Sequence, residues 1–377
     1  MSSDLKSIPI ARPALGEEEA EAARRAILSG WVTQGPEVAA FEEEFADYVG
    51  ARHACAVSSC TTALHLALHA LGVDRGHEVV TVSHSFIATA NAVRCCGARP
   101  VFVDIDPLTY NLDPGRIEAV LSPRTRAILC VHQLGMPCDL SAIVALARRA
   151  GLWVVEDAAC ASGSEIRWGE GWDRVGRPHG DLACFSLHAR KVITTGEGGM
   201  LTTNDAALYQ RARRLRDHAM SPERRYFHEE RGFNYRITNL QAALGVAQLE
   251  RIDEFLNRRT DIMNWYHSEI AASAEVRLNR VKNWAKSAFW MVCLEVDWFD
   301  EKSREAFMQA LKRRGIDSRP YFCTMSALPM YRQTPLPVAA KKAQIGLNLP
   351  SFFALTKSDV RRIGADVNEL LREMCPA

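Results

Sequence analysis

The chain has 377 residues, with 46 Lys and Arg against 45 Asp and Glu, and 47% of its residues are hydrophobic. This composition is typical of a globular enzyme and excludes disordered, collagen-like and coiled-coil proteins. A formal charge of +1 gives no broad positive field for non-specific nucleic-acid binding, so we expect no nucleic-acid partner. An anionic ligand would have to be held by a local site.

The amino-terminal sequence and the cysteines indicate the cellular compartment of the protein. The first residues have no cationic stretch followed by an apolar core, and no apolar run is long enough to cross a membrane. The 11 cysteines are scattered without a C-x-x-C pair, which favours neither a disulfide framework nor a zinc site. We therefore expect a cytoplasmic protein with reduced thiols, no membrane partner and no bound metal.

Short apolar runs alternate with amphipathic segments through the first two-thirds of the chain. This alternation is typical of βαβ units on a mostly parallel sheet that is buried on both faces. The segment between 159 and 180 is expected to form a hairpin or a long loop. The predicted strands are 77–82, 99–105, 126–132, 152–158, 181–187 and 198–203.

The pattern changes from Leu240 onward. Apolar residues at helical spacing predict one long helix that continues towards residue 270. A strand-like run follows at 290–298, with helices expected at 300–314 and 357–373. We therefore predict a large α/β domain over residues 1–240, and a connecting helix with a small α+β domain over residues 241–377.

One lysine has surroundings that are unusual for a solvated charge. The segment CFSLHARKVITTGEGGM places Lys191 just after a buried strand and before Gly196, Gly198 and Gly199. A lysine that acts as a nucleophile needs a lowered pKa, which partial burial next to cationic or apolar groups supplies. A surface charge remains the ordinary interpretation of a lysine.

Two further segments predict ligand-binding positions. In WVVEDAACASG an apolar strand ends at Asp157, and the carboxyl ends of parallel strands are where open α/β sheets bind ligands; a helix cap is the alternative. In AVSSCTTALHLAL a strand leads through Ser59, Thr61 and Thr62 into a helix. Free amides at such a helix start suit a phosphate, and a plain cap is again the alternative.

Together these segments resemble a known family almost from end to end. They are similar to the pyridoxal-phosphate aminotransferases of the DegT/DnrJ/EryC1/StrS type, which mostly aminate keto sugars carried on nucleotides. Within that family, residues 221–236 and 318–322 are most similar to the GDP-perosamine synthase group. The segments that carry the resemblance are 30–46, 83–93, 100–106, 156–159, 185–200 and 233–253.

The resemblance implies a fold and a catalytic residue. It implies an α/β protein of fold type I, with a mostly parallel seven-stranded sheet in the large domain and a small α+β carboxyl-terminal domain. Lys191 matches the lysine that forms a Schiff base with pyridoxal 5'-phosphate (PLP) and later moves the proton. Asp157 matches the carboxylate that pairs with the pyridine nitrogen and keeps it protonated, which makes the ring a stronger electron sink.

The resemblance also implies the other cofactor-binding positions. Phe86 matches an aromatic residue stacked on the cofactor ring, with core packing as the alternative. Cys60 and Thr61 match a phosphate-binding pair, and Ser186 matches a further phosphate ligand. Asn234 matches an asparagine that reaches the phosphate in the neighbouring subunit, so a homodimer with shared sites is expected.

The chain departs from the family pattern at two places. Cys160 replaces the Gln or His that contacts the cofactor hydroxyl in many relatives, and a thiol is a poor hydrogen-bonding substitute. The segments 165–179 and 323–331 also differ from those of the perosamine-like group. The first departure predicts that the reactivity of the bound cofactor differs from that in many relatives. The second leaves the identity of the sugar substrate undetermined.

The reaction implied is a transamination in two half-reactions. L-glutamate is expected as the amino donor, which leaves pyridoxamine 5'-phosphate (PMP), and a nucleotide-linked 4-keto-6-deoxy sugar of the perosamine type is expected as the acceptor. His188 and Arg319 are candidate substrate residues, and Arg224 and Arg225 are further candidates for phosphate. A structural or solvated role is the alternative for each of these four.

Four other functions remain to be weighed. A 3-keto sugar, a keto-cyclitol or another ketone of an antibiotic pathway fits the same chemistry. A sugar dehydratase of the same family is disfavoured because that branch has histidine where this chain has Lys191. A catalytically silent relative would be expected to lack Lys191 or Asp157, and both are present. A nicotinamide dehydrogenase is disfavoured because no strand leads into G-x-G-x-x-G.

Overall fold

The computed structural model describes residues 7–334 and 336–375. Its largest element is a seven-stranded sheet with the strand order β1-β9-β8-β5-β4-β2-β3. β9 is antiparallel to both of its neighbours, and every other adjacent pair is parallel. The strands are β1 (His53–Val57), β2 (Glu78–Val82), β3 (Arg99–Val103), β4 (Thr125–Val131), β5 (Trp153–Asp157), β8 (Leu182–Ser186) and β9 (Gly199–Thr203).

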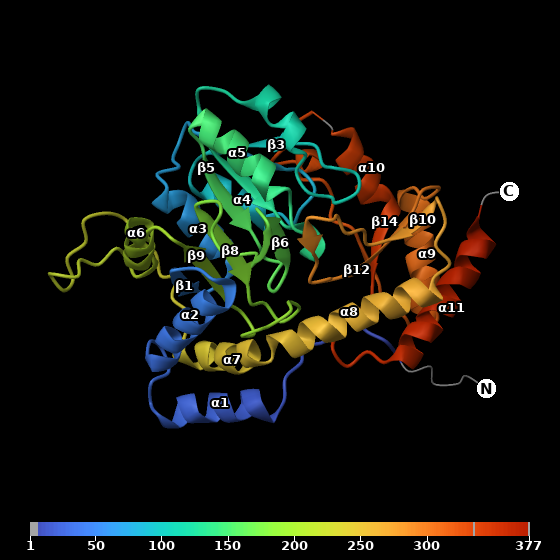
Figure 1. The fold of residues 1–377 in the computed structure, drawn as a ribbon, viewed down its shortest axis with the longest axis horizontal. Coiled ribbons are helices and arrows are strands. Elements are labelled where there is room, and N and C mark those ends of the chain that lie inside the picture. Colours follow the sequence, from blue (N-terminus) through green and yellow to red (C-terminus); the bar gives the residue numbers. More distant parts are fainter. Residues whose placement is uncertain (1–6, 335, 376–377) are drawn as a thin grey trace.

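Helices cover both faces of this sheet, as an α/β protein requires (Figure 1). One face packs on α3 (Cys60–Ala70), α4 (Ala88–Cys95) and α6 (Ala206–Arg216). The other packs on α2 (Pro36–Val49) and α5 (Leu140–Ala150). The α/β class and the seven-stranded, mainly parallel sheet are therefore confirmed.

Two helices lie outside these layers and connect the molecule. α1 (Glu17–Leu28) packs against α7 (Asn239–Glu250) through small buried alanines. α8 (Ile252–Glu269) follows α7 and runs along the molecule towards the carboxyl-terminal region (Figure 1). The single long helix expected from Leu240 is wrong in one respect, because it is broken at Arg251, whose φ and ψ are −106° and 4°.

A second, four-stranded sheet has the order β10-β12-β14-β13. It packs with α8, α9 (Glu301–Arg313) and α11 (Lys357–Met374) around a separate apolar core. α10 (Pro337–Ile345) leads directly into β14. The strands are β10 (Val276–Leu278), β12 (Val292–Val296), β13 (Arg319–Pro320) and β14 (Gly346–Leu349). The domain boundary at residue 240 stays a prediction.

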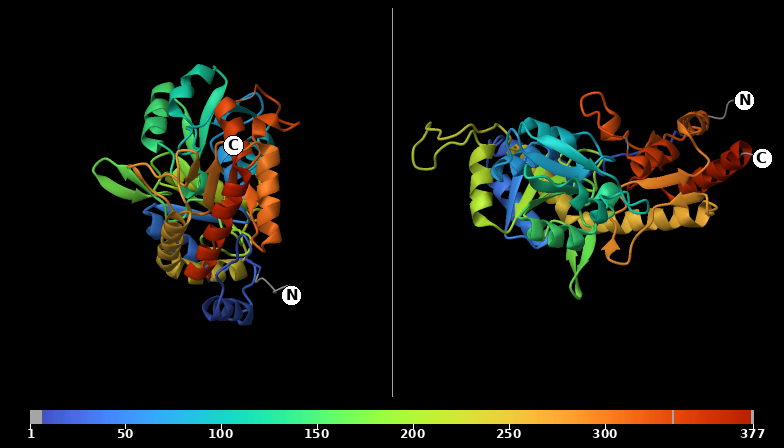
Figure 2. Two further views of the ribbon diagram at one scale, coloured as in Figure 1. Left: turned by 90° about the vertical axis from the view of Figure 1, so that its right-hand side faces the viewer. Right: turned by 90° about the horizontal axis from the view of Figure 1, so that it is seen from above.

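The segment between β5 and β8 forms the expected hairpin. β6 (Glu165–Trp168) pairs with β7 (Gly171–Arg174), and β11 (Ala285–Lys286) adds a third strand from the carboxyl-terminal part. Seen from above, the molecule is elongated, and the segment that follows α6 extends away from its body (Figure 2). Short 3-10 helices cover Pro114–Arg116, Glu118–Val120, Gln133–Gly135 and Met325–Ala327.

No helix within the described residues is long and apolar enough to span a bilayer.

Candidate active site

Lys191 lies where the part of the chain that forms the seven-stranded sheet meets the part that forms the four-stranded sheet. It follows β8 in a turn whose backbone returns to β9. Its Nζ atom lies 3.2 Å from Sγ of Cys160 and 3.9 Å from the centre of the Trp290 indole ring. The Trp290 Nε1 donates a hydrogen bond of 2.8 Å to the carbonyl of Arg190. The lysine is therefore half-buried between a thiol and an aromatic face, and it is not a freely solvated charge.

Asp157 ends β5 and is only 4% exposed. Its Oδ2 accepts a hydrogen bond of 2.8 Å from the Thr89 hydroxyl, and its Oδ1 accepts one of 3.1 Å from the amide of Ala159. Burial raises the pKa of this carboxyl group, although the hydrogen bonds and the charge of Lys191 oppose the rise. A buried carboxylate of this kind is stabilised when a cation is placed against it.

The neighbouring acid, Glu156, is already used within the fold. The amide of Cys138 donates to Nδ1 of His132 at 3.1 Å, so the proton of the neutral imidazole lies on Nε2. That Nε2 donates to Oε2 of Glu156 at 3.0 Å, and the amide of Gly180 donates to Oε1 at 3.3 Å. Of the two acids in the EDAA segment, only Asp157 is left for a ligand.

The start of α3 offers amides to an anion. Ser59 caps the helix and accepts a hydrogen bond from the amide of Thr62. The first-turn amides of Cys60 and Thr61 have no intrahelical carbonyl partner. Gly199 of β9 lies against this turn, since a Cβ atom there would stand 2.4 Å from the carbonyl carbon of Ser59. The turn is thus held close to the sheet edge, where helix N-termini bind phosphate.

Two other predicted cofactor residues lie at or just beyond the carboxyl ends of strands β8 and β2. Ser186 is the last residue of β8, and its Oγ accepts a hydrogen bond of 3.4 Å from the amide of His188. Phe86 lies between β2 and α4 with 56% of its surface exposed, and its ring centre is 5.7 Å from that of Phe322. An exposed aromatic ring at a strand end is available to a planar ligand.

Cys60, Asp157, Cys160 and Lys191 lie close enough together that the charges of the last three act on the Cys60 thiol. The remaining predicted residues are elsewhere. His188 faces Glu197 at 3.7 Å, and Arg319 pairs with Asp317. The carbonyl of His188 accepts a hydrogen bond of 2.9 Å from the amide of Lys191. Among the residues that the structure describes, the side chains of His188 and Arg319 form no hydrogen bond or ion pair with the side chain of Lys191 or Asp157.

The other candidates lie on the extended segment after α6. Asn234 is exposed in the single chain. Arg224 and Arg225 are also exposed and lie over the rings of Phe227 and Tyr226, at 4.9 Å and 5.0 Å from the ring centres. Within one chain, these residues are not brought into the group around Lys191.

Two residues that contact Asp157 and Lys191 were not predicted from the sequence. Thr89 bonds directly to Asp157, and Trp290 covers Lys191. Thr89 lies in the segment 83–93 that carries the family resemblance, so a signal for it was present. Trp290 lies 99 residues from Lys191 along the chain, and only the packing of the second sheet brings them together.

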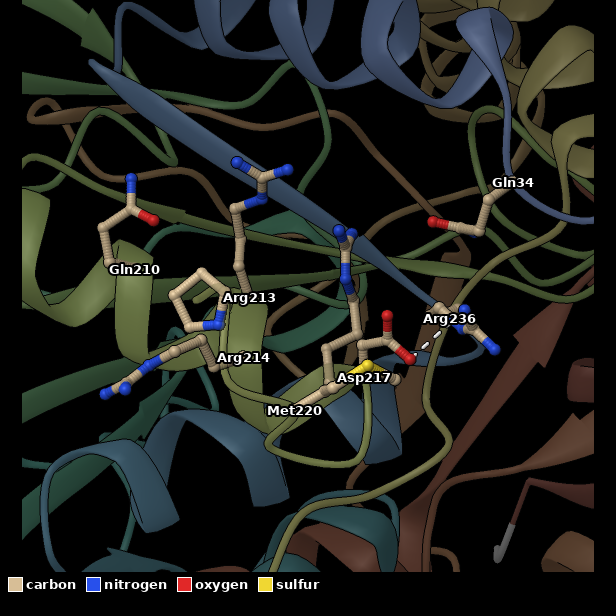
Figure 3. A pocket seen from close by; sticks show the side chains of 9 residues that line it. Gln34, Gln210, Arg213, Arg214, Asp217, Met220 and Arg236 are labelled. Carbon is tan, nitrogen blue, oxygen red and sulfur yellow. Dashed lines mark ion pairs between the residues drawn. The ribbon is translucent and has the colours of Figure 1, made fainter. Parts of the chain in front are cut away.

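A pocket lined by arginines lies near the carboxyl end of β1 (Figure 3). Its volume is about 310 Å³. Arg236 pairs with Asp217 at 3.2 Å, and its backbone bridges to Val57, two residues before Ser59. Arg213 has no acidic partner among the described residues. The lining residues are Gln34, Gln210, Arg213, Arg214, Arg216, Asp217, Met220, Pro222 and Arg236.

The fold and this grouping of residues define an aminotransferase active site that fits PLP. The buried carboxylate suits a protonated pyridine nitrogen, the α3 amides suit a phosphate, and Lys191 is the amine between them. The chain belongs to the DegT/DnrJ/EryC1/StrS aminotransferase family, whose profile matches residues 13–368. The enzyme is therefore a PLP-dependent transaminase.

Individual relatives are similar over almost the whole chain. A GDP-perosamine synthase of Caulobacter vibrioides is 42% identical over 374 residues, which cover 98% of this chain and 100% of the relative. The aminotransferase TlmJ of Streptoalloteichus hindustanus has a TM-score of 0.92 at 34% identity, with 98% and 100% coverage. DesV of S. venezuelae, solved with a ketimine intermediate, has a TM-score of 0.90 at 32% identity, with 99% and 100% coverage.

Proposed function

We propose that this transaminase moves an amino group from L-glutamate to a nucleotide-linked 4-keto-6-deoxy sugar. The observation that carries the proposal is the arginine-lined pocket near the start of α3. Guanidinium groups bind phosphate bidentately, and a nucleotide-linked sugar carries phosphate groups. The similarity to GDP-perosamine synthases supports the same acceptor. A free ketone would have no use for such a pocket.

Different residues would bind different parts of the cofactor. When bound, PLP supplies an electron sink for breaking bonds at the carbon that carries nitrogen. Asp157 holds the proton on the pyridine nitrogen, because a nearby negative charge favours the charged form of the ring. The amides of Cys60 and Thr61, with Ser186, bind the phosphate. Phe86 packs on the face of the ring.

Lys191 anchors the cofactor and then acts as the base. With the cofactor bound, the Nζ of Lys191 would lie within reach of the reacting carbon and would accept and return the proton there. The indole of Trp290, 3.9 Å away, limits the positions that Nζ can take and excludes water from one side. Cys160, at 3.2 Å from Nζ, replaces a stronger hydrogen-bonding partner with a weak one.

The substrate residues follow from the same proposal. His188 lies three residues before Lys191 and is half-buried, so it borders the acceptor. Arg319, near the start of the second sheet's edge strand, would exchange its pairing with Asp317 for a phosphate. Arg224 and Arg225 are exposed on the extended segment, and in a dimer they would be available to the phosphates of a nucleotide-linked acceptor.

We further propose that the active unit is a cytoplasmic homodimer. Asn234 is exposed and lies on the extended segment, where it makes no hydrogen bond to the cofactor turn of its own chain within the described residues. A second copy of the chain in a symmetric dimer gives the asparagine a phosphate to bind, and each site then needs both chains.

The test is to incubate the purified holoenzyme with L-glutamate and a panel of keto sugars, followed by mass analysis of the products. The panel contains nucleotide-linked 4-keto and 3-keto sugars, a free keto sugar and a keto-cyclitol. Preferential amination of a nucleotide-linked 4-keto sugar is expected. Equal turnover of the free ketones would contradict the nucleotide-linked acceptor, and loss of water from the sugar without amination would indicate a dehydratase.

A further inference from the structure

Three metal-ligating side chains meet on the α3 face of the large sheet, away from Lys191. His65 and His69 are one helical turn apart on α3, so both project from the same side of the helix. Cys96 is the C-cap residue of α4, which packs against α3 (Figure 1). One imidazole nitrogen from each histidine and the thiol sulfur lie within 4.8 Å of one another. Small rotamer changes bring such a set to bonding distance of one ion.

The surrounding backbone favours a cation at this point. His69 is in the last turn of α3, and Cys96 terminates α4. The carboxyl-terminal ends of two helices therefore converge on the cluster, and helix C-termini carry partial negative charge. Neither helix presents its positive end to these side chains.

His65 is also oriented as a metal-binding histidine is. Its Nδ1 lies 2.9 Å from the Tyr235 hydroxyl, which leaves Nε2 as the nitrogen available to an ion. A hydrogen bond from the second ring nitrogen is the usual support of a metal-ligating histidine, because it fixes the tautomer and the ring orientation.

Aromatic rings close one side of the cluster. The Phe233 ring centre lies 4.8 Å from that of His65 and 5.3 Å from that of His69, and Phe233 stacks on Tyr235 at 4.9 Å. His65 and Cys96 are buried, whereas His69 is half-buried. His69 is therefore the most solvent-accessible of the three, and a water molecule there can complete a coordination shell.

We propose that His65, His69 and Cys96 form a Zn²⁺ site, with water as the fourth ligand. Two imidazoles and one thiolate are the borderline donors that Zn²⁺ prefers, and three protein ligands with one open position are a common arrangement. This differs from the expectation of no bound metal, which rested on cysteines scattered without a C-x-x-C pair. The ligands come from two separate helices, and only the spacing of His65 and His69 was visible along the chain.

A metal ion here would connect three parts of the active site. α3 begins at the phosphate-binding turn, and Tyr235 adjoins Asn234 and accepts a hydrogen bond at its backbone carbonyl from the amide of Ser58. Zn²⁺ at the far end of α3 would therefore hold this helix, α4 and the segment around Asn234 in one arrangement. This effect is structural and does not depend on which substrate the enzyme takes.

The site can be tested on the tag-free holoenzyme after removal of metals with a chelator. We expect it to bind one Zn²⁺ per chain in a competition titration. Co²⁺ in place of Zn²⁺ should give a thiolate charge-transfer band in the near ultraviolet and intense d–d bands in the red, where the cofactor does not absorb. Zn²⁺ should abolish both. Weak d–d bands typical of six-coordinate Co²⁺, or no binding, would overturn the proposal.

Variants assign the ligands. His69→Gln and Cys96→Ser are expected to lower the Zn²⁺ affinity at least about 100-fold, and Tyr235→Phe about tenfold, as loss of an outer hydrogen bond does. His267→Gln, at an exposed position on α8, and Cys95→Ser, at the exposed neighbouring cysteine, should retain the wild-type affinity and Co²⁺ spectrum. Circular dichroism verifies that each variant is folded. Unchanged binding in Cys96→Ser, or lost binding in Cys95→Ser, would overturn the assignment.

Discussion

At the scale of single residues, Lys191 is defined by what surrounds its amine. A thiol lies 3.2 Å from its Nζ, and the centre of an indole ring lies 3.9 Å from it. The sequence placed this lysine after a buried strand, which was enough to single it out. The covering by Trp290 comes from the second sheet, and no local pattern contains it.

Replacing Lys191 by alanine tests its two proposed roles together. We expect Lys191→Ala to lose the visible absorbance band of the covalently held cofactor and to lower the transamination rate about 10³-fold or more, since an anchoring and a proton-transferring group are both removed. Lys302→Ala, at an exposed position on α9, is the matched control. A Lys191→Ala enzyme with an unchanged spectrum would contradict the assignment.

His84 gives a pH dependence of stability at the same scale. It is buried, neither ring nitrogen has a hydrogen-bond partner among the described residues, and burial lowers its pKa from 6.5 to about 4. Between these values the unfolded chain binds a proton that the folded chain does not bind. The stabilising contribution is therefore present above pH 6.5 and is lost as the pH falls towards 4, by about 3 kcal/mol in all.

His84→Leu should remove this loss, because leucine fills a similar volume and does not titrate. Denaturant unfolding at a series of pH values between 7 and 4 would measure the effect, provided that the transition is two-state at each pH. The variant is expected to lose less free energy of unfolding on acidification than the wild type. Equal losses in the two proteins would show that His84 is not responsible.

At the scale of secondary-structure elements, a helix or strand can be predicted when its buried residues form an apolar run or recur at a regular spacing in the sequence. The sheet strands are buried on both faces and stand out as apolar runs, and the carboxyl ends of β5 and β8 then indicate Asp157 and Lys191. The break between α7 and α8 leaves no such sign. Apolar spacing continues through Leu249, Ile252 and Phe255, all of them buried, while Arg251 at the break pairs with Glu19 of α1.

The other unpredicted elements are short or assembled from distant segments. β11 and β13 have two residues each, too few for a period to be recognised. The cluster of His65, His69 and Cys96 depends on the packing of α3 against α4, and Trp290 depends on the position of the second sheet. Local sequence patterns carry no information about these tertiary approaches.

The contact between β9 and the start of α3 gives a prediction about cofactor binding. A side chain at Gly199 would meet the backbone of Ser59 and Cys60 at 2.4 to 2.6 Å, so Gly199→Ala must displace the phosphate-binding turn. We expect about tenfold or greater loss of PLP affinity, and a loss of stability of about 1–3 kcal/mol from overpacking. Titration of the apoenzyme with PLP, monitored by visible absorbance, measures the PLP affinity.

Gly171→Ala is the matched control for this change. Gly171 also begins a strand, and the nearest atom to a Cβ there is the carbonyl oxygen of Trp168 at 3.9 Å. This variant should bind PLP as the wild type does. If Gly199→Ala bound PLP equally well, the turn at Ser59 would not be the phosphate site.

At the scale of the whole molecule, the active site depends on contacts between its two halves. Trp290, two residues before β12, reaches Lys191; Phe322 lies beside Phe86, and the amide of Met325 donates to the carbonyl of Ser83. The two sheets therefore meet at the site, while α8 joins them along one side (Figure 1). A change in either half is expected to alter the rate through these contacts.

The proposed sharing of residues between subunits can be tested by mixing two inactive variants. Lys191→Ala disables the site of its own chain, and Asn234→Ala disables the site of its neighbour. In a mixed dimer, one site receives both substitutions and the other receives neither. After dissociation and random reassembly of equal amounts, we expect recovery of roughly a quarter of the wild-type activity, because half of the dimers are mixed and each has one intact site of two.

Mixing Lys191→Ala with Asp157→Asn provides the control. Both residues approach the same Cys60 thiol within one chain, so each site in a mixed dimer lacks one of them and no activity should return. Recovery with Asn234→Ala but not with Asp157→Asn would be specific to a shared site, since general stabilisation of a damaged chain would act on both mixtures. If neither mixture regained activity while gel filtration showed that mixed dimers had formed, Asn234 would act within its own chain, and the site would not need a second subunit.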